Sequence, residues 1–325
     1  MESVEVSGVS PLPALVHDVG NRADDSQTHY SISTQALSSA AIAELRDYRC
    51  FETPQGWVLA LDAASLHTFL WRPQDGERIQ LPPLDQVLPL RCKCLLTDKP
   101  GAPSGCFVVV FDLDTDGMWV CRIGGADRWE SFSCDLDEGR RHIAKGHGIA
   151  AVGGKIYYEL SGYELGTITF GSDSLPDLDG RIDVDMVDLP LSKPMGSTYL
   201  VESCGDLFLV VIFFDGYNVH KIAELTVYKM DFSEPAWCKV DDIGADRVFL
   251  LGGDMIGISN FGASCSAGGG LQGNCVYFLN HLAITENFLH VFDLKNGDEQ
   301  VQRPFNHKGF PTPPRPPFWL LPSTE

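Results

Sequence analysis

A chain of 325 residues with 44% hydrophobic and 21% charged side chains has the composition of a folded globular protein, which excludes an intrinsically disordered one. Its 44 acidic and 24 basic side chains give a formal net charge of −20, so we expect neither nucleic acid nor a membrane surface as a partner. The longest apolar run, residues 207–214, is far shorter than the roughly 20 residues that a membrane-spanning helix needs.

The N-terminus predicts an unstructured start without a targeting signal. Glu2 and Glu5 stand where a secretory or organellar signal carries basic residues. We expect residues 1–10 to form a short disordered segment and residues 11–323 to form a single domain. The cysteines are scattered, and several lie within apolar runs. In a chain without a signal peptide this favours buried, reduced thiols and a location in the cytoplasm or the nucleus.

Strand signals dominate the chain. Few stretches place apolar side chains at helical spacing. The best of them, residues 34–45 (TQALSSAAIAEL), predicts either one short helix or a loop that leads into a strand. Elsewhere, short runs rich in Val, Ile, Phe, Tyr and Trp are bounded by Gly, Asp, Asn or Pro. They cover residues 56–62, 106–112, 117–123, 148–152, 155–160, 207–214, 225–231, 247–251, 274–280 and 289–294. The pattern predicts an antiparallel all-β protein.

Glycine-containing junctions predict tight hairpins between these strands. A turn that follows the right-handed twist of its strands needs positive φ, which glycine adopts without a clash. Gly153 and Gly154 separate two apolar runs in IAAVGGKIYY, and Asp116 and Gly117 do so in FDLDTDGMWV. We expect a two-stranded hairpin at both places.

A repeated unit recurs along the chain. Segments that begin at residues 69, 119, 167, 226 and 290 each contain an apolar strand, a polar turn and a second strand, at intervals of roughly 50 to 65 residues. One four-stranded unit cannot bury its own faces, whereas units packed around an axis bury both. We therefore predict a kelch-like β-propeller of about six four-stranded blades. Residues 318–321 should pair with the first blade, formed by LPALVHD and THYSIST, so that N- and C-terminal strands close the ring.

A family resemblance is carried by the ordered series LPALVHD, GWVLALD, RPQDGERIQLPPL, YLVESCGDLFLVV, AWCKVDDIGADRVFLLGG, GLQGNCVYFLN, VFDLKNG and PPFWLLPS. Over nearly its whole length the chain resembles the plant F-box-associated KIB-type β-propeller family. In that family the propeller commonly follows an F-box, which docks on a Skp-type adaptor while the propeller presents a target for ubiquitination. The resemblance implies a plant source and a propeller that recognises another protein.

The chain departs from the family plan at its start. About ten residues precede LPALVHD, whereas the three amphipathic helices of an F-box need several times that length. We therefore expect no direct binding to a Skp-type adaptor. The leading prediction is a non-enzymatic propeller that binds another protein through loops on one face of the ring. Two alternatives stay open: a propeller hydrolase or small-ligand binder that uses the central channel, and a ubiquitin-ligase substrate adaptor that acts through a partner.

The motif SAGGGLQGNCVYF places Gly268, Gly270 and Gly273 at the spacing of a dinucleotide-binding fingerprint. Such a fingerprint needs a helix after the glycines, because the amides at the helix N-terminus face the pyrophosphate. The residues that follow here are β-branched and aromatic and predict a strand. The favoured interpretation is a hairpin or interblade loop, and no cofactor is predicted.

The motif DLDTDG matches the opening of an EF-hand calcium loop, with Asp112, Asp114, Asp116 and Gly117 at the required spacing. The carboxylate that should occupy position twelve is replaced by Ile123, and the following residues predict a strand. A hairpin turn is therefore the favoured interpretation.

The motif RCKC offers Cys92 and Cys94 as two thiol ligands, whereas a zinc site needs about four donors. No second cysteine pair or histidine pair stands at a suitable spacing. Alternation along a strand places both thiols on one side of it. No metal site is predicted.

Two charged segments are candidate partner surfaces. In RIDVDMVD the apolar Ile182, Val184 and Met186 alternate with acidic residues, so the strand has one buried and one acidic face, which either meets a basic partner or simply faces water. The acidic residues of this region are Asp173, Asp177, Asp179, Asp183, Asp185 and Asp188. The basic cluster in EGRRHIAKGHG is either a site for an acidic peptide or phosphate or an ordinary interblade loop; it comprises Arg140, Arg141, His142, Lys145 and His147.

No catalytic residue is predicted. A nucleophile with a nearby base would be signalled by motifs such as G-x-S-x-G, S-x-x-K or H-E-x-x-H, and none occurs. The histidines are scattered singly and are better interpreted as structural or exposed residues.

Overall fold

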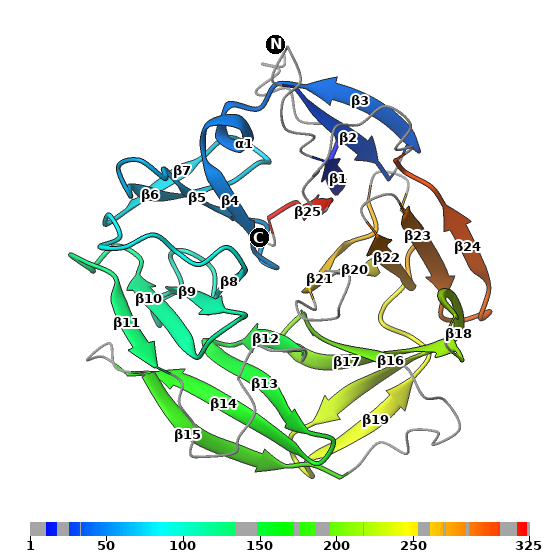
Figure 1. Cartoon of the computed structure of the whole chain (residues 1–325). Coiled ribbons are helices and arrows are strands. Elements are labelled where there is room, and N and C mark those ends of the chain that lie inside the picture. The colour runs from blue at the N-terminus through cyan, green and yellow to red at the C-terminus, as the bar shows by residue number, and fades with distance from the viewer. Residues whose placement is uncertain are drawn as a thin grey trace.

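The computed structural model describes residues 11–17, 26–32, 34–133, 148–171, 176–185, 196–216, 218–252, 261–268, 271–283, 286–305 and 317–323. Its strands form six sheets arranged around one axis, each running outward from the centre (Figure 1). The six-bladed β-propeller predicted from the repeat is thereby confirmed. In the described part of the chain, no helix is long and apolar enough to cross a membrane.

Five of the six sheets contain four antiparallel strands each. From the inner to the outer strand, blade 1 consists of β25 (Phe318–Leu320), β1 (Ala14–His17), β2 (Gln27–Ser31) and β3 (Ala36–Ala40). In the same order, blade 2 consists of β4 (Arg49–Glu52), β5 (Val58–Leu61), β6 (Thr68–Trp71) and β7 (Arg78–Leu81). Blade 3 consists of β8 (Cys92–Leu96), β9 (Phe107–Asp112), β10 (Gly117–Arg122) and β11 (Glu130–Ser133). Blade 4 consists of β12 (Ile149–Val152), β13 (Lys155–Ser161), β14 (Glu164–Phe170) and β15 (Pro176–Asp183), and blade 5 of β16 (Gly196–Ser203), β17 (Asp206–Asp215), β18 (Asn218–Asp231) and β19 (Ala236–Val240).

Blade 6 differs from the predicted four-stranded pattern. It contains, from the inner strand outward, β21 (Phe261–Ser266), β20 (Arg247–Gly252), β22 (Cys275–Ala283), β23 (Glu286–Asp293) and β24 (Glu299–Gln302). β20 pairs antiparallel with β21 and parallel with β22. The chain therefore enters this blade one strand away from the centre, returns along the inner edge and crosses over to β22.

The segment at residues 34–45, predicted to be a short helix or a loop into a strand, is divided between two elements. β3 takes residues 36–40 and pairs with β2, and α1 (Ala43–Asp47) follows as a single turn of helix. Pairing with β2 overrides the weak helical spacing of the first half, while Ile42 and Leu45 are buried between blades 1 and 2.

Both predicted hairpins are confirmed. Positive φ at glycine explains the first turn, whereas Gly117 has no positive φ and is the first residue of β10. β12 and β13 are joined through Gly153 and Gly154, whose φ values are +56° and +83°. The outermost hairpins of blades 2 and 6 share a second turn type, in which Gly76 and Gly297 have φ of +78° and +71°. A side chain at these four positions would be strained, so the repeat seen in the sequence is a repeat of backbone geometry.

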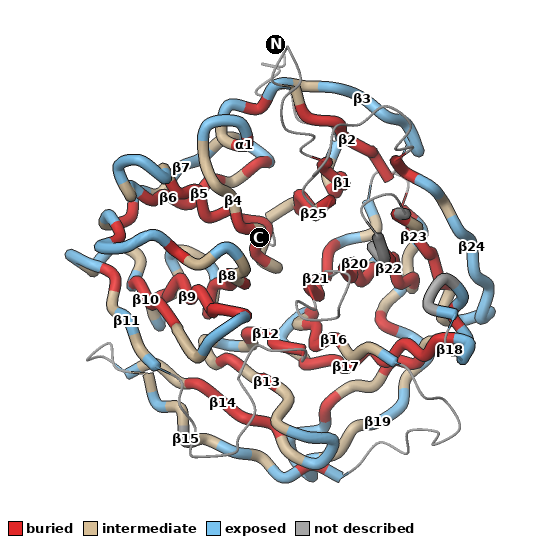
Figure 2. Tube along the Cα trace, viewed as in Figure 1, coloured by how far each residue is buried: buried red, intermediate tan, exposed pale blue. Residues whose placement is uncertain are grey.

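Hydrophobic side chains fill the space between neighbouring blades. Six clusters of buried residues are present in the described structure, and each joins two adjacent blades, from the blade 1–2 cluster round to the blade 6–1 cluster. Figure 2 shows the buried residues concentrated in the inner and middle strands, whereas the outermost strands β3 and β24 are largely exposed.

The apolar run in β17 illustrates how each sheet is buried on both faces. Phe208, Val210, Ile212 and Phe214 belong to the blade 5–6 cluster. The residues between them, Leu207, Leu209, Val211 and Phe213, belong to the blade 4–5 cluster. Because successive side chains of a strand point to opposite faces, a run that is apolar throughout is the expected sequence for a strand covered on both sides.

The C-terminal strand closes the ring, as predicted. β25 pairs antiparallel with β1 through Ala14↔Leu320, Leu15↔Trp319 and Val16↔Phe318. Trp319, only 1% exposed, lies in the blade 6–1 cluster, and its Nε1 donates a hydrogen bond of 3.1 Å to the carbonyl oxygen of Leu251 in blade 6. The adjacent Leu320 faces the blade 1–2 cluster instead. One short strand thus contacts both neighbours of the seam.

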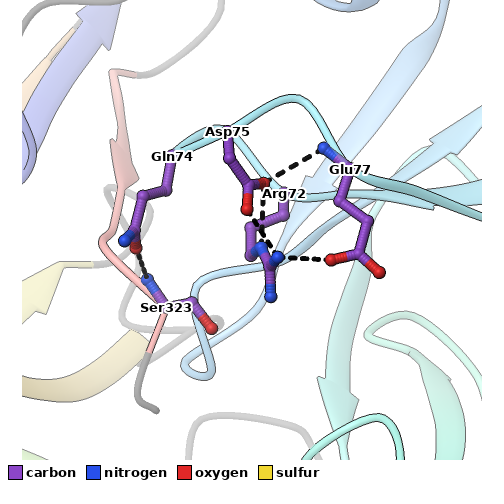
Figure 3. A network of polar contacts seen from close by, with 5 residues as sticks. All are labelled: Arg72, Gln74, Asp75, Glu77 and Ser323. Atoms are coloured by element: carbon purple, nitrogen blue, oxygen red, sulfur yellow. Dashed lines mark hydrogen bonds and ion pairs between the residues drawn. The ribbon is translucent and has the colours of Figure 1, made fainter. Parts of the chain in front are cut away.

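The chain after β25 is held on blade 2 (Figure 3). The amide of Ser323 donates a hydrogen bond of 3.0 Å to Gln74 Oε1, in the β6–β7 turn. In the same turn Arg72 Nε donates to Asp75 Oδ1 at 2.9 Å, and the guanidinium also pairs with Glu77. These contacts fix the turn that receives the C-terminal segment.

We predict that Trp319→Ala lowers the free energy of unfolding by about 3–5 kcal/mol, because it empties a packed site at the seam of the ring. Trp319→Phe keeps most of the packing but leaves the Leu251 carbonyl without its donor, and should cost about 1–3 kcal/mol. Urea unfolding measures both values.

The control for the seam variants is Val301→Ala in the exposed outer strand β24, which should change stability by less than about 0.5 kcal/mol. Equal effects of Trp319→Ala and Val301→Ala would contradict the closing role of β25.

Candidate functional site

The basic cluster proposed from the sequence, Arg140, Arg141, His142, Lys145 and His147, lies outside the described residues. The structure neither places these side chains together nor separates them.

The glycine segment forms the crossover inside blade 6. Strand β22 begins at Cys275, two residues after Gly273, so the predicted strand is confirmed. The loop joins strands of one blade rather than two blades. A Cβ on Gly273 would lie 1.9 Å from the carbonyl oxygen of Ala245, so this glycine is required by close backbone approach. The Asn274 side chain ties the segment to the preceding turn by accepting from the amide of Ile243 and donating to the Asp241 carbonyl. Gly270 lies outside the described residues.

The DLDTDG motif forms the turn between β9 and β10, as predicted. Asp112 accepts hydrogen bonds from the Asp114 amide at 2.9 Å and from the Thr115 hydroxyl, and Asp114 pairs with Arg91 at 3.0 Å. The carboxylate of Asp112 thus stabilises its own turn. In the part of the chain that the structure describes, no group of three or more His, Cys, Asp or Glu residues is placed to hold a metal ion.

The two thiols of RCKC face the same side of β8, as alternation predicts. Cys92 and Cys94 both pack in the blade 2–3 cluster, and burial raises the pKa of the Cys92 thiol to about 12. Burial raises the pKa of Cys94 as well. No described cysteine forms a disulfide. A raised pKa disfavours the thiolate, which is the form of cysteine that acts as a nucleophile or metal ligand.

The acidic strand has the two faces that its alternation predicts. Ile182 and Val184 pack in the blade 4–5 cluster, while Asp183 and Asp185 are exposed. Met186 and Asp188 are outside the described residues. The amide of Val184 donates to the Tyr163 carbonyl at 2.8 Å, and the amide of Asp185 donates to the Pro235 carbonyl at 3.0 Å. The end of this strand therefore bridges blades 4 and 5.

Three charged side chains from three blades interact near the centre of the ring. Glu52 ends β4, the inner strand of blade 2; Lys93 is in β8, the inner strand of blade 3; and Glu159 is in β13 of blade 4. Lys93 interacts electrostatically with both carboxylates and is only 5% exposed. Glu52 and Glu159 are partly exposed. We call these three residues the central cluster.

Glu159 is held by hydrogen bonds across the blade 4–5 seam. Its Oε2 accepts from the Thr198 hydroxyl of blade 5 at 2.7 Å and from the Gly148 amide at 2.8 Å. A Cβ on Gly148 would lie 2.5 Å from the Leu200 amide nitrogen, so glycine is needed where the amide approaches the carboxylate. The carboxylate position is therefore set by two donors on different elements.

Burial shifts the protonation equilibria of the central cluster. It raises the pKa of Glu52 to about 7, with the Lys93 charge opposing the rise, and lowers the pKa of Lys93 to about 7, with the charges of Glu52 and Glu159 opposing the fall. Burial also raises the pKa of Glu159, against the hydrogen bonds from Thr198 and Gly148. Glu52 and Lys93 therefore titrate near neutral pH, where exposed glutamates and lysines do not.

A cleft of about 60 Å³ opens beside Glu159, between blades 4 and 5. Its apolar walls are Leu165, Val184, Leu209, Val211 and Trp237. Its polar lining is Glu159, Ser161, Gly162, Glu164 and Thr198. We call it the blade 4–5 cleft. It combines an apolar wall with a carboxylate that is already oriented by two hydrogen bonds.

Two exposed aromatic side chains lie in turns that flank the blade 4–5 seam. Tyr163, in the β13–β14 turn, is 61% exposed, and its carbonyl accepts from Val184, which lines the cleft. Phe232, in the β18–β19 turn, is 42% exposed and lies 5.3 Å from the ring of Tyr157, centroid to centroid. Aromatic residues are enriched at protein–protein interfaces relative to the rest of a protein surface.

Sequence reasoning missed the central cluster and the cleft. Their members come from segments that share no motif, and the ring alone brings them together. One signal was available: Lys93 interrupts the apolar run of β8 between two cysteines, and a charge within a strand that is buried on both faces needs a partner.

A family model described as KIB1-4 beta-propeller matches residues 29–302 of the chain. An F-box protein of Arabidopsis thaliana is 29% identical over 161 residues, which make up 42% of this chain and 37% of that protein. The match therefore spans little more than a third of the length of that relative.

Three solved structures are similar to the chain at low sequence identity. A protein from Lactobacillus plantarum has a TM-score of 0.37 and 10% identity, covering 90% of this chain and 95% of that one. A nidogen/laminin complex gives 0.35 and 10%, covering 89% and 92%. A streptogramin B lyase gives 0.33 and 13%, covering 84% and 72%.

We predict that Glu52→Gln changes the pH dependence of stability below neutrality. The folded protein keeps the Glu52 proton up to about pH 7, whereas the unfolded chain releases it near 4.5. The unfolded state binds fewer protons between these values, so the contribution of Glu52 to the free energy of unfolding falls as the pH rises through this window. Urea unfolding at several pH values should show the variant gaining stability relative to the wild type over the same window.

Lys93→Met tests the same cluster in the opposite window. The folded protein releases the Lys93 proton at about pH 7 and the unfolded chain near 10.5, so the Lys93 contribution to stability rises with pH between them, and the variant should lack that rise. Glu234→Gln, in the exposed β18–β19 turn, controls for net charge. Wild-type slopes in both windows for both variants would refute the shifted pKa values of the central cluster.

Proposed function

Because the chain belongs to the KIB1-4 β-propeller family, we propose that it is a protein–protein interaction module that recognises its partner without catalysing a reaction. The observation that carries the proposal is the pair of exposed aromatic side chains, Tyr163 and Phe232, in the turns that flank the blade 4–5 seam. Aromatic residues bury a large area on binding at a small cost in side-chain entropy, and they dominate the energetics of many interfaces.

The dimensions of the blade 4–5 cleft support a macromolecular partner. Pockets for drug-sized ligands enclose about 300–1,000 Å³. The cleft offers about 60 Å³, which accommodates the tip of one side chain and little more. A partner that inserts one side chain and covers the neighbouring aromatic groups fits these dimensions better than a free metabolite does.

The similarity to an F-box protein supports a more specific role within this function. We propose that the propeller supplies target recognition, as a substrate adaptor in the cytoplasm or the nucleus, and that any link to a ubiquitin ligase is made by a partner. Purified chain should then fail to bind a Skp-type adaptor directly and should co-purify with it only from plant extract.

A second candidate function, binding or hydrolysis of a small ligand at the centre of the ring, is favoured by the central cluster. A lysine whose pKa is lowered to about 7 is neutral enough near pH 7 to act as a general base or nucleophile. A carboxylate whose pKa is raised to about 7 can donate a proton at the same pH. The two groups lie on the inner strands of neighbouring blades.

We predict that the double variant Tyr163→Ala/Phe232→Ala captures much less of the partner than the wild-type protein does when each is incubated with the same plant extract. The loss of two aromatic anchors should weaken binding at least about tenfold, since truncated hot-spot residues typically cost more than about 1–2 kcal/mol. Quantitative mass spectrometry of the captured proteins gives the measurement.

Leu37→Ala/Val301→Ala is the matched control, because it removes two exposed apolar side chains from the outer strands of blades 1 and 6. It should retain the partner. Partner recovery that is equal for both double variants would place the interface elsewhere on the ring.

The small-ligand candidate predicts a different result. A thermal-shift screen of small carboxylates, phosphates and carbonyl compounds should find a ligand that stabilises the wild type and fails to stabilise Lys93→Met. Ligands that stabilise both proteins equally bind elsewhere and would exclude the central cluster as the site.

A further inference from the structure

We propose that the blade 4–5 cleft binds a lysine side chain of a partner protein, with the ammonium group against Glu159 and the methylene stem against Trp237. The inference rests on the proposed interaction function, because that function supplies the partner, and it specifies the chemistry by which the partner is recognised.

The walls of the cleft suit the stem of an unbranched side chain. Leu165, Leu209 and Val211 are buried residues of blades 4 and 5, and Trp237 is half-buried on β19. A lysine carries four methylenes that gain free energy when they are removed from water against such groups. The indole ring of Trp237 also offers a face that attracts a cation.

Two hydrogen bonds fix the position of the Glu159 carboxylate, which lines the cleft. Both donors that hold Glu159, the Thr198 hydroxyl and the Gly148 amide, bind Oε2. No described residue donates to Oε1. The other carboxylate of the cleft, Glu164, pairs with Arg181 at 3.1 Å. Of the two, Glu159 is therefore the carboxylate better placed to accept a new hydrogen bond from an ammonium group.

The volume of the cleft selects the size of the occupant. Its volume of about 60 Å³ is well below the roughly 300–1,000 Å³ of a pocket for a drug-sized ligand and suits the end of a single side chain. An ammonium group with its adjacent methylenes fits that space, whereas a planar guanidinium with five donors demands more room and more acceptors. The cleft is therefore better suited to lysine than to arginine.

Charge outside the cleft favours a basic partner segment. Asp183 and Asp185, which flank the cleft residue Val184, are exposed, as is Glu234 in the neighbouring β18–β19 turn. The chain as a whole carries a formal net charge of −20, which attracts cationic segments over distances of about 10 Å at moderate salt. Lys93 approaches Glu159 from blade 3, and its burial keeps it only partly charged near neutral pH.

The test uses the whole chain labelled with ¹⁵N-tryptophan and two capped amino acids in mildly alkaline buffer. Nα-acetyl-lysine methylamide should shift the indole N–H resonance of Trp237, identified with Trp237→Phe, in a saturable manner, with a dissociation constant of about 1–10 mM. Nα-acetyl-norleucine methylamide, which has the stem without the charge, should bind at least about tenfold more weakly.

Glu159→Gln should weaken lysine binding by at least about tenfold, and Glu164→Gln is the matched control that should retain binding within about threefold. Unchanged positions of the other tryptophan resonances show that each variant is folded. If Glu159→Gln does not fold, Thr198→Val removes the hydroxyl that orients the carboxylate and should weaken binding instead. A folded wild type whose Trp237 does not respond, equal binding of lysine and norleucine, or wild-type binding by Glu159→Gln would overturn the proposal.

The inference and the proposed function fail in distinguishable ways. A partner that is lost from Tyr163→Ala/Phe232→Ala and fully retained by Glu159→Gln supports the interaction function and rejects the lysine site. Binding of the capped lysine without any partner that depends on Tyr163 and Phe232 supports the cleft chemistry and rejects the proposed interface.

Discussion

Every sheet of this protein is apolar on both faces, and this single constraint determines the architecture. In β17, alternate residues of one unbroken apolar run contribute to the clusters on either side of blade 5. A sheet of this kind is stable only with a neighbour on each side, so a linear stack would leave two apolar faces in water. A ring leaves none. The described strands meet the condition with six clusters at six seams, the last of which is completed by Trp319 and β25.

Closure also determines where function can reside. Because the flat faces of the blades are used for packing, the surfaces that remain are the turns, the outer strands and the inner edge of the ring. At the blade 4–5 seam, the amide of Gly148 donates a hydrogen bond to Glu159. Packing between the two blades is incomplete there and leaves the cleft beside Glu159. The aromatic side chains of Tyr163 and Phe232 lie in turns at this same seam. A binding site at the seam uses the rigidity of two packed blades while adding no strand to the fold.

The features that the sequence predicted well are those with a local physical cause. Alternation predicted the buried and acidic faces around Val184, paired glycines predicted the hairpin between β12 and β13, and a terminal apolar segment predicted ring closure. The features it missed depend on contacts between distant segments. In blade 6, β21 occupies the inner edge beside β20, so that β22 pairs with β20 and not with β21. The sequence of these strands does not distinguish this order from a simple meander. Likewise, Glu52, Lys93 and Glu159 meet only because three blades converge, and Lys93 alone carried a local signal.

The central cluster and the cleft share one carboxylate, so they are energetically linked. Glu159 interacts electrostatically with Lys93 of blade 3 and also lines the cleft. A cation placed in the cleft stabilises the ionised form of Glu159, which lowers the pKa of that carboxyl. A protonated Lys93 in turn competes with the cation for the same negative charge, so the two sites are coupled in free energy, and the coupling is reciprocal. Binding of a cation in the blade 4–5 cleft therefore changes the electrostatics of the central cluster, because Glu159 belongs to both sites.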